Sequence, residues 1–158
     1  MPFERCAYFE DLRVGQEFNT PGRTITEADI VTYAGLSGDY NPLHVDEVFA
    51  ANSPYGRRIA QGLLSLSVTS GLIARLGLLE GAVLAFRGLT CKFVKPVFIG
   101  DTVYARIRVR GAKLLQQAKS GLVELAVKLY NQHEQVVQSG TWKVLLRARG
   151  SAQDQGKD

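Results

Sequence analysis

The sequence predicts an α+β domain in which one long buried helix is covered by an antiparallel β-sheet. The first observation is the apolar segment 63–76, which is long enough for a helix. The second is the series of strand-like segments after it, with no helix between them. Successive strands without intervening helices favour antiparallel pairing, and a sheet that covers a single helix must curl around it. The third is the length of 158 residues, which suits one domain.

The first part of the chain contains short elements that lead up to the long helix. Residues 14–18 and 23–25 are typical of short strands around a turn at Pro21–Gly22. Thr26 resembles a helix N-cap, because acidic residues follow it and apolar residues then recur at helical spacing. We expect this helix to end within residues 35–38, where glycine occurs twice.

An irregular turn is predicted next, over residues 37–42, because Gly, Asp, Asn and Pro are concentrated there. A further short helix is expected over residues 46–51. His44 lies between the two, on the way out of the turn. These pieces form an additional short-helix segment ahead of the long helix.

Residues 63–76 are apolar around most of the helix circumference, with small hydroxyl side chains between the large ones. This pattern indicates a helix that is buried on more than one side. The long strands of a meandering sheet are expected after it, at residues 82–94, 102–111, 122–130 and 136–146. We predict a single domain over residues 1–147. A flexible tail is expected over 148–158, where polar residues and glycine replace the apolar pattern.

The composition is that of a globular protein and does not indicate binding of nucleic acid. Hydrophobic residues make up 46% and charged residues 22%, which excludes a disordered chain. The net charge of +4 is mild and the basic residues are spread along the sequence. The longest apolar region, 63–79, is interrupted by polar residues and falls short of a membrane span. Since the N-terminus does not resemble a secretory signal, we expect a cytoplasmic protein with no membrane partner.

The two cysteines, Cys6 and Cys91, are far apart in the sequence. Two cysteines without neighbouring metal-binding residues form neither a disulfide framework nor a zinc site. We therefore expect two reduced, structural thiols. We expect no metal and no cofactor.

A carboxylate and an imidazole lie five positions apart in the segment Gly38–His44. A folded-back turn could bring Asp39 and His44 to one shared water, and such a pair can divide proton donation and acceptance near neutral pH. Pro42 restricts its own φ and favours an extended Asn41, which can then orient the site. By spacing alone another interpretation stays open, in which Asp39 and Asn41 only form the turn and His44 is a hydrogen-bonded structural histidine.

Residues 33–50 resemble the hydratase motif of the (R)-specific enoyl-CoA hydratase and MaoC-like dehydratase family. The match is unbroken, and residues 62–64 and 92–101 resemble the family pattern too, so the likeness covers roughly residues 15–147. The resemblance implies the hot-dog fold, a long central helix wrapped by a curved, mostly antiparallel sheet. It also implies that the additional short-helix segment carries the hydratase motif.

The resemblance further implies reversible hydration of a trans-2-enoyl thioester to an (R)-3-hydroxyacyl thioester. Asp39 and His44 would hold the water that attacks C3, remove its proton and supply one to C2, with Asn41 in support. The backbone N–H of Gly62 would donate to the thioester oxygen, a role that suits the first residue of a helix. Ser70 matches the family's supporting serine; the alternative is a mid-helix serine bonded to the preceding turn.

The expected partner is an acyl-CoA or acyl-carrier-protein thioester, in which coenzyme A is part of the substrate. Gln61 is a local departure, because relatives commonly carry histidine before the helix-start glycine. We also expect a homodimer or a dimer of dimers, because a lone curved sheet leaves open edges. Candidates for contact with ligand phosphates, each of which is otherwise a solvated surface charge, are Arg57, Arg58, Lys92 and Lys95.

Two other functions remain open on the same fold. A carboxylate that activates water could direct it to the thioester carbonyl, which would give an acyl-CoA thioesterase. A non-catalytic subunit that binds acyl thioesters is the other alternative, because a fold does not guarantee chemistry. The pairing of Asp39 with His44 favours the hydratase, since the histidine is best explained by protonation at C2. Acyl chain length does not follow from the sequence.

Overall fold

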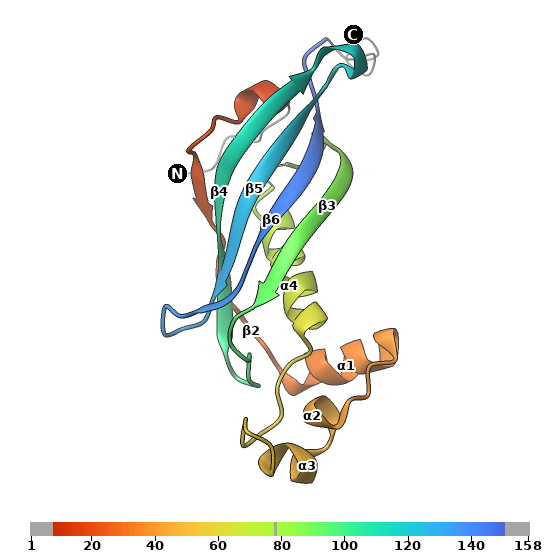
Figure 1. Ribbon diagram of the computed structural model, residues 1–158, viewed down its shortest axis with the longest axis vertical. Coiled ribbons are helices and arrows are strands. Elements are labelled where there is room, and N and C mark those ends of the chain that lie inside the picture. Colours follow the sequence, from red (N-terminus) through yellow and green to blue (C-terminus); the bar gives the residue numbers. More distant parts are fainter. Residues whose placement is uncertain (1–7, 78, 151–158) are drawn as a thin grey trace.

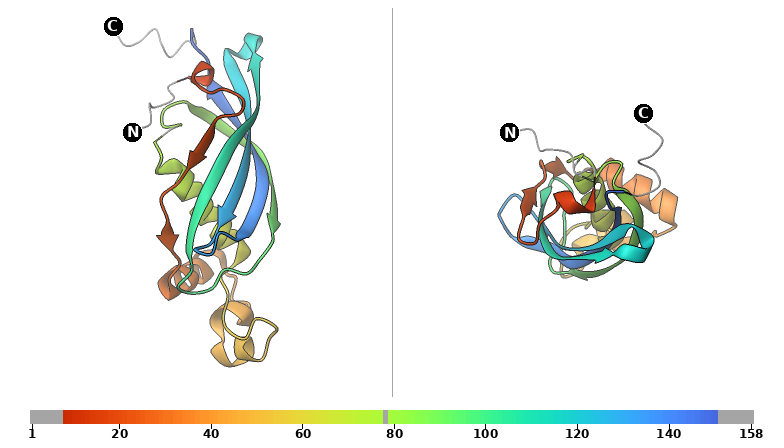
Figure 2. Two further views of the ribbon diagram at one scale, coloured as in Figure 1. Left: turned by 90° about the vertical axis from the view of Figure 1, so that its left-hand side faces the viewer. Right: turned by 90° about the horizontal axis from the view of Figure 1, so that it is seen from above.

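The computed structural model describes residues 8–77 and 79–150, in which a sheet curves around one long helix (Figure 1). Helix α4 lies on the concave side of the sheet, as the view from above shows (Figure 2). Three shorter helices lie together beyond one end of the sheet (Figure 1). The elements in chain order are η1 (Phe9–Asp11), β1 (Glu17–Asn19), β2 (Arg23–Thr24), α1 (Glu27–Ser37), α2 (Pro42–Val45), α3 (Glu47–Ala51), α4 (Gly62–Ala74), β3 (Val83–Phe93), β4 (Thr102–Leu115), η2 (Gln116–Ala118), β5 (Ser120–Tyr130) and β6 (Val136–Arg147).

The sheet is antiparallel in every pairing, with the strand order β1-β4-β5-β6-β3 and β2 also paired with β4. The predicted meander holds for β4, β5 and β6. It is wrong for β3, which lies beside β6 at the far edge of the sheet instead of beside β4. The reason is the connection over residues 94–101, which crosses one end of the sheet (Figure 1). Local strand patterns identify strands but not their neighbours.

The core lies between the concave face of the sheet and α4. Buried and exposed residues alternate along β4 and β5, as expected for a sheet with one face on the core and the other in water. The inward side chains of these strands pack with Leu64, Val68 and Leu72 of α4 in one continuous cluster. Within the described residues, no helix combines the length and the apolar character needed to cross a membrane.

Helix α4 is buried on one broad side only, in contrast to the predicted burial on several sides. The sheet covers the rows that contain Leu64 and Ser65, whereas Ser67, Ser70 and Gly71 are exposed. The prediction is wrong because the residues on the exposed side, such as Ser67, Ser70 and Gly71, are mostly small. They do not interrupt the hydrophobic pattern of the sequence, but they provide few atoms for packing. The exposed side forms a shallow stripe along the outside of this chain.

Two residues after the predicted domain boundary at residue 147 contact the rest of the domain. Ala148 is buried, and the side chain of Arg149 forms an ion pair with Asp11 of η1. The backbone N–H of Arg149 also donates to the Glu10 carboxylate at 3.2 Å. Composition placed the boundary where apolar residues stop, whereas a short polar segment is fixed here by acidic residues near the start of the domain. Residues 151–158 of the expected tail and Cys6 lie outside the described residues.

Candidate active site

The loop at residues 38–41, called the motif loop below, joins α1 to α2, and a series of local hydrogen bonds gives it its shape. Gly38 adopts a left-handed conformation with φ 77°, which glycine reaches without strain, and its N–H donates to Ala34 at 2.8 Å. The N–H of Asp39 then donates to the Ser37 hydroxyl at 3.2 Å, and that of Asn41 donates to the Asp39 carboxylate at 3.3 Å. The chain therefore turns tightly around the Asp39 side chain.

Helix α2 follows at once and contains His44, where the sequence predicts only the exit from an irregular turn. Asn41 is the N-cap: its side-chain oxygen accepts from the N–H of Leu43 at 3.0 Å, and Pro42 occupies the first helical position. The helix was missed because its four residues are too few to show a helical period. The predicted orienting role of Asn41 corresponds here to a structural contact, the start of the turn that carries His44.

The side chains of Asp39 and His44 approach each other across this turn. His44 Nε2 lies 3.9 Å from Asp39 Oδ2. This separation is longer than a direct hydrogen bond and leaves room for a shared hydrogen-bonding atom beside both groups. The imidazole is mostly buried, with 11% of the side chain exposed, whereas the carboxylate is 46% exposed. One group thus faces the interior and the other faces the solvent.

A backbone carbonyl fixes the tautomer of His44. Nδ1 lies 2.8 Å from the carbonyl oxygen of Ile59. Because a carbonyl can only accept a hydrogen bond, Nδ1 must carry a hydrogen, and the neutral ring has its lone pair on Nε2. That lone pair is on the nitrogen nearer to Asp39, where a proton acceptor is useful.

Gly62 is the first residue of α4, and its backbone N–H is available to a ligand. The N-cap Gln61 makes no side-chain capping bond, and within residues 8–77 and 79–150 no acceptor is bonded to this N–H. Helix N-termini carry unsatisfied donors and partial positive charge. A Cβ at this position would lie 3.0 Å from the ring of Phe93, so glycine also allows close packing here.

His44 and Gly62 line the same cavity, of about 270 Å³. One wall comes from α2, the loop before α4 and the first turn of α4; the other comes from β3, the segment after it and β6. Asp39 and Asn41 are not among its lining residues, and Asp39 reaches the site through its approach to His44. The remaining lining residues are Tyr55, Ile59, Ala60, Ser65, Phe93, Val94, Lys95, Pro96, Val97, Val137 and Gln138. A few polar groups thus converge in a largely apolar cavity, as is typical of ligand sites.

Gln138 is the most informative of the lining residues that sequence reasoning missed. It is 3% exposed, and its amide nitrogen lies 3.5 Å from the hydroxyl oxygen of Thr69. That hydroxyl already donates to the carbonyl of Ser65 at 2.8 Å, so it can only accept from Gln138. The amide oxygen of Gln138 is then left without a hydrogen-bond partner among the described residues. A polar residue on the inward face of a strand was the available signal.

Ser70 is not brought together with His44 and Gly62. It is exposed on α4 and lines a second cavity, of about 440 Å³, near the other end of the helix. Apolar side chains dominate that cavity, and in it the rings of Phe86 and Trp142 meet edge to face with centroids 5.3 Å apart. The serine of α4 that does line the His44 cavity is Ser65.

Arg58, one of the four candidates for contact with ligand phosphates, is held by acidic residues of the chain. It forms ion pairs with Glu27 of α1 at 2.8 Å and with Glu47 of α3 at 2.6 Å. Hydrogen bonds to Glu27 and then Glu47 raise the pKa of its guanidinium above the usual value. Arg58 therefore connects α1 and α3, which lie before and after the segment that contains Asp39 and His44.

Of the other three candidates, only Lys95 lies at the His44 cavity. The guanidinium of Arg57 lies over the ring of Phe98 at 4.1 Å. Lys92 occupies a position on β3 opposite Ser139 of β6 and does not line the cavity. The structure thus gives these four side chains different surroundings.

Gln61, the residue that departs from the family pattern, is fully buried. Its side-chain nitrogen donates to the carbonyl of Ile30 at 3.3 Å, which ties the start of α4 to α1. Gln61 does not line the cavity, so its side chain supports the loop before α4 and does not contact the ligand site. In the described part of the chain Cys91 is a free thiol whose pKa is raised by burial, and no cluster of three potential metal ligands occurs there.

Comparison with known proteins gives a consistent set of relatives. The profile of the MaoC like domain matches residues 10–131. The chain is 42% identical over 104 residues to the (R)-specific enoyl-CoA hydratase of Rhodospirillum rubrum, a match that covers 66% of this chain and 70% of the relative. It is 40% identical over 107 residues to Protein MaoC of Klebsiella aerogenes, where the match covers 67% of this chain but only 31% of that longer protein.

Solved structures agree in fold. The MaoC-like dehydratase from Rhodospirillum rubrum superposes with a TM-score of 0.82 at 28% identity, over 90% of this chain and 97% of that one. A Mycobacterium tuberculosis protein with a double hot-dog fold superposes with a TM-score of 0.78 at 24% identity, over 91% of this chain and 45% of that one. The predicted hot-dog fold is confirmed. The chain therefore belongs to the MaoC-like domain family, whose named hydratases and dehydratases are hydro-lyases.

Proposed function

We propose that this protein catalyses the reversible hydration of a trans-2-enoyl thioester to the (R)-3-hydroxyacyl thioester. The observation that carries the proposal is that His44 and the first residue of α4, Gly62, line one cavity. The Nε2 atom of His44 lies 3.9 Å from the carboxylate of Asp39. The names of the relatives support the reaction class, since they include an (R)-specific enoyl-CoA hydratase and, from Methylorubrum extorquens, a 3-hydroxybutyryl-CoA dehydratase at 38% identity.

In this mechanism the acid/base pair acts on one water molecule. The carboxylate of Asp39 accepts a hydrogen bond from one O–H of the water, whose hydrogen stays on the oxygen, and the lone pair of His44 Nε2 removes the other proton as the oxygen bonds to C3. The C2–C3 double bond supplies electrons to C2 and the thioester oxygen. The pair then returns a proton to C2, so the elements of water add across the double bond and both side chains recover their starting states.

The N-terminus of α4 stabilises the charge that develops during this step. The thioester oxygen becomes enolate-like as C3 is attacked, and the free N–H of Gly62 donates to it together with the positive end of the helix dipole. Such a donor contributes about a hundredfold or more to turnover. The acid/base pair and the donor lie on different elements, so the substrate is held between α2 and α4.

The substrate is an acyl thioester whose carrier is coenzyme A or an acyl carrier protein. Relatives of both kinds occur: a mitochondrial protein of Arabidopsis thaliana named as a 3-hydroxyacyl-[acyl-carrier-protein] dehydratase is 30% identical over 116 residues. Lys95 at the cavity is the candidate that we retain for contact with carrier phosphates. We also retain the prediction of a cytoplasmic protein without a cofactor.

We further propose that the protein is a homodimer, alone or within a dimer of dimers, assembled through β3. This strand of 11 residues is at one end of the strand order, and exposed large side chains along it include Phe86, Leu89 and Phe93. Long apolar edge strands favour pairing with another chain. Light scattering at about micromolar concentration should give twice the mass of one chain, or four times that mass for a dimer of dimers; the mass of a single chain would contradict the dimer.

The function is tested by following the loss of enoyl absorbance with crotonyl-CoA and longer enoyl-CoA substrates, with chiral analysis of the product. We expect the (R)-3-hydroxyacyl product. Release of free thiol without loss of the double bond would indicate a thioesterase instead. Tight binding of acyl-CoA by calorimetry, without turnover of any enoyl ester, would indicate a non-catalytic subunit.

A further inference from the structure

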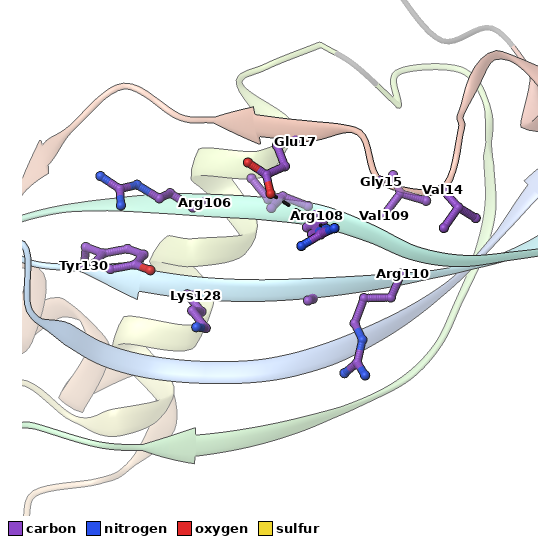
Figure 3. A pocket seen from close by; sticks show the side chains of 11 residues that line it. Val14, Gly15, Glu17, Arg106, Arg108, Val109, Arg110, Lys128 and Tyr130 are labelled. Atoms are coloured by element: carbon purple, nitrogen blue, oxygen red, sulfur yellow. Dashed lines mark ion pairs between the residues drawn. The ribbon is translucent and has the colours of Figure 1, made fainter.

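The convex face of the sheet carries a group of cations that the proposed reaction does not use. Arg106, Arg108 and Arg110 occupy alternate positions on β4 and are exposed on the side away from α4 (Figure 3). Lys128 lies opposite Arg106 on β5. With the segment at residues 14–17, these four side chains line a hollow of about 510 Å³, which we call the cationic groove.

The arrangement of charge in the cationic groove is unfavourable for the fold by itself. Arg106 and Lys128 are direct cross-strand partners, and like charges at such positions destabilise a sheet. Arg106 has Glu134 as a partner at 2.6 Å, but Arg108 reaches Glu17 only at 3.7 Å, with both side chains largely exposed. A pair of that kind contributes little to stability.

Two of the cations are free for a ligand. Within residues 8–77 and 79–150 neither Arg110 nor Lys128 forms an ion pair. Both side chains extend toward β6 from neighbouring strands (Figure 3). The small side chain of Ala126 also lines the groove, opposite Arg108 on β5. The result is an open, shallow hollow with unpaired positive charge along it.

We propose that the cationic groove binds an acidic segment of a partner protein, whose carboxylates pair with Arg108, Arg110 and Lys128. Arginine forks match carboxylates in geometry, and Arg106 and Arg108 already take carboxylates of this chain. Alternate positions on a strand are about 7 Å apart. Acidic side chains three or four residues apart on a helix have a similar spacing of about 5–6 Å.

Two other anionic partners fit the groove less well. Binding of single-stranded nucleic acid uses free aromatic faces, but Tyr130 already stacks with Tyr104 at 5.5 Å and lies under the guanidinium of Arg106 at 4.5 Å. Binding to an anionic membrane surface favours large apolar side chains that insert into the lipid. The only exposed large apolar residue that lines the groove is Val14.

The experiment is fluorescence anisotropy with a labelled helical peptide that has glutamate at every fourth position, measured on the full chain. Arg110→Gln/Lys128→Gln should weaken binding by about tenfold, because two charge pairs are lost. Arg75→Gln/Lys113→Gln is the matched control: it removes the same charge from residues that do not line the groove and should leave binding unchanged. Hydration of enoyl-CoA should be the same in both variants.

Equal weakening in both variants would overturn the proposal, since binding would then reflect net charge alone. So would equal binding of a peptide with glutamine in place of each glutamate. Tighter binding of oligouridylate, or of phosphatidylserine vesicles, that is lost only in the groove variant would also overturn it in favour of nucleic acid or lipid. None of these outcomes depends on hydratase activity, so failure here and failure of the proposed reaction are distinguishable.

Discussion

The cavities at the two ends of α4 differ in the chemistry that their walls can support. The larger one, of about 440 Å³, is lined by Ser70 and by mainly apolar side chains, which include the aromatic rings of Phe86 and Trp142. The smaller one, of about 270 Å³, contains His44 and the first residue of the helix, Gly62. Volume alone would favour the larger of these two cavities as a ligand site. Converging polar groups and a free helix N-terminus favour the smaller one, and our proposal rests on it.

Substitution of the proposed acid/base pair should have the largest effect on turnover, and it tests whether the smaller cavity is the catalytic one. His44→Ala and Asp39→Asn should each lower kcat for enoyl-CoA hydration by at least about a hundredfold, because each removes one partner in proton transfer. Ser70→Ala in the other cavity is the matched control and should retain nearly full turnover. Circular dichroism should report an intact fold in all three variants. Full activity in His44→Ala or Asp39→Asn would remove that residue from the mechanism.

Crowding at the helix N-terminus should have a smaller effect. Gly62→Ala keeps the backbone N–H but places a Cβ 3.0 Å from the ring of Phe93, so we expect turnover to fall by about tenfold through displacement of the thioester. Phe93→Leu in the same chain makes room for the methyl group and should restore part of the lost activity. No recovery in the double variant, by steady-state kinetics, would mean that the contact with Phe93 is not the cause.

A substitution at Gln138 would distinguish a role in the reaction from a role in the stability of the fold. Its amide oxygen has no partner among the described residues, so Gln138→Leu should leave stability unchanged or raise it by about 1 kcal/mol. Turnover should fall several-fold if that oxygen accepts a hydrogen bond from the substrate or its water. Denaturation and kinetics on the same preparation measure both. Lower stability with unchanged turnover would assign Gln138 to packing alone.

The smallest expected effect lies outside both cavities, at the start of α1. Burial alone would raise the pKa of the Asp29 carboxyl, but hydrogen bonds from Thr26 and the charge of Arg23 outweigh it and lower the pKa. The stabilisation is therefore present above the unfolded pKa and is lost as pH falls through the lowered folded value. Asp29→Asn should cost up to about 1 kcal/mol at neutral pH. Urea denaturation at a series of decreasing pH values should show the difference from the wild type shrinking below the ordinary carboxyl pKa.

The parts of the site that could be predicted are those formed by residues that are consecutive in the sequence. The motif loop and the start of α4 each depend on local signals: glycine and proline positions, capping residues and one apolar period. Thr26 and Gly38 do bound α1, and Gly62 does begin α4. The approach of Asp39 to His44 also follows from a single turn.

The opposite wall of the cavity could not be predicted, because it combines strands that are far apart in the sequence. Phe93 and Gln138 become neighbours only because β3 crosses to the far edge and pairs with β6. No local pattern specifies that crossing. The position of Ser70 could not be predicted for a related reason: Ser65 and Ser70 lie on one helix, and only the path of the sheet around that helix decides which serine lines the cavity.

The position of Phe93 has a consequence for how the activity should depend on protein concentration. The residue lies on the strand with the free edge and also lines the cavity with His44. If a second chain docks on that edge, it orders one wall of the site, and occupancy of the site becomes linked to association by mass action. Specific activity should then decline on dilution and recover on concentration, and substrate should shift the same equilibrium toward the assembled form.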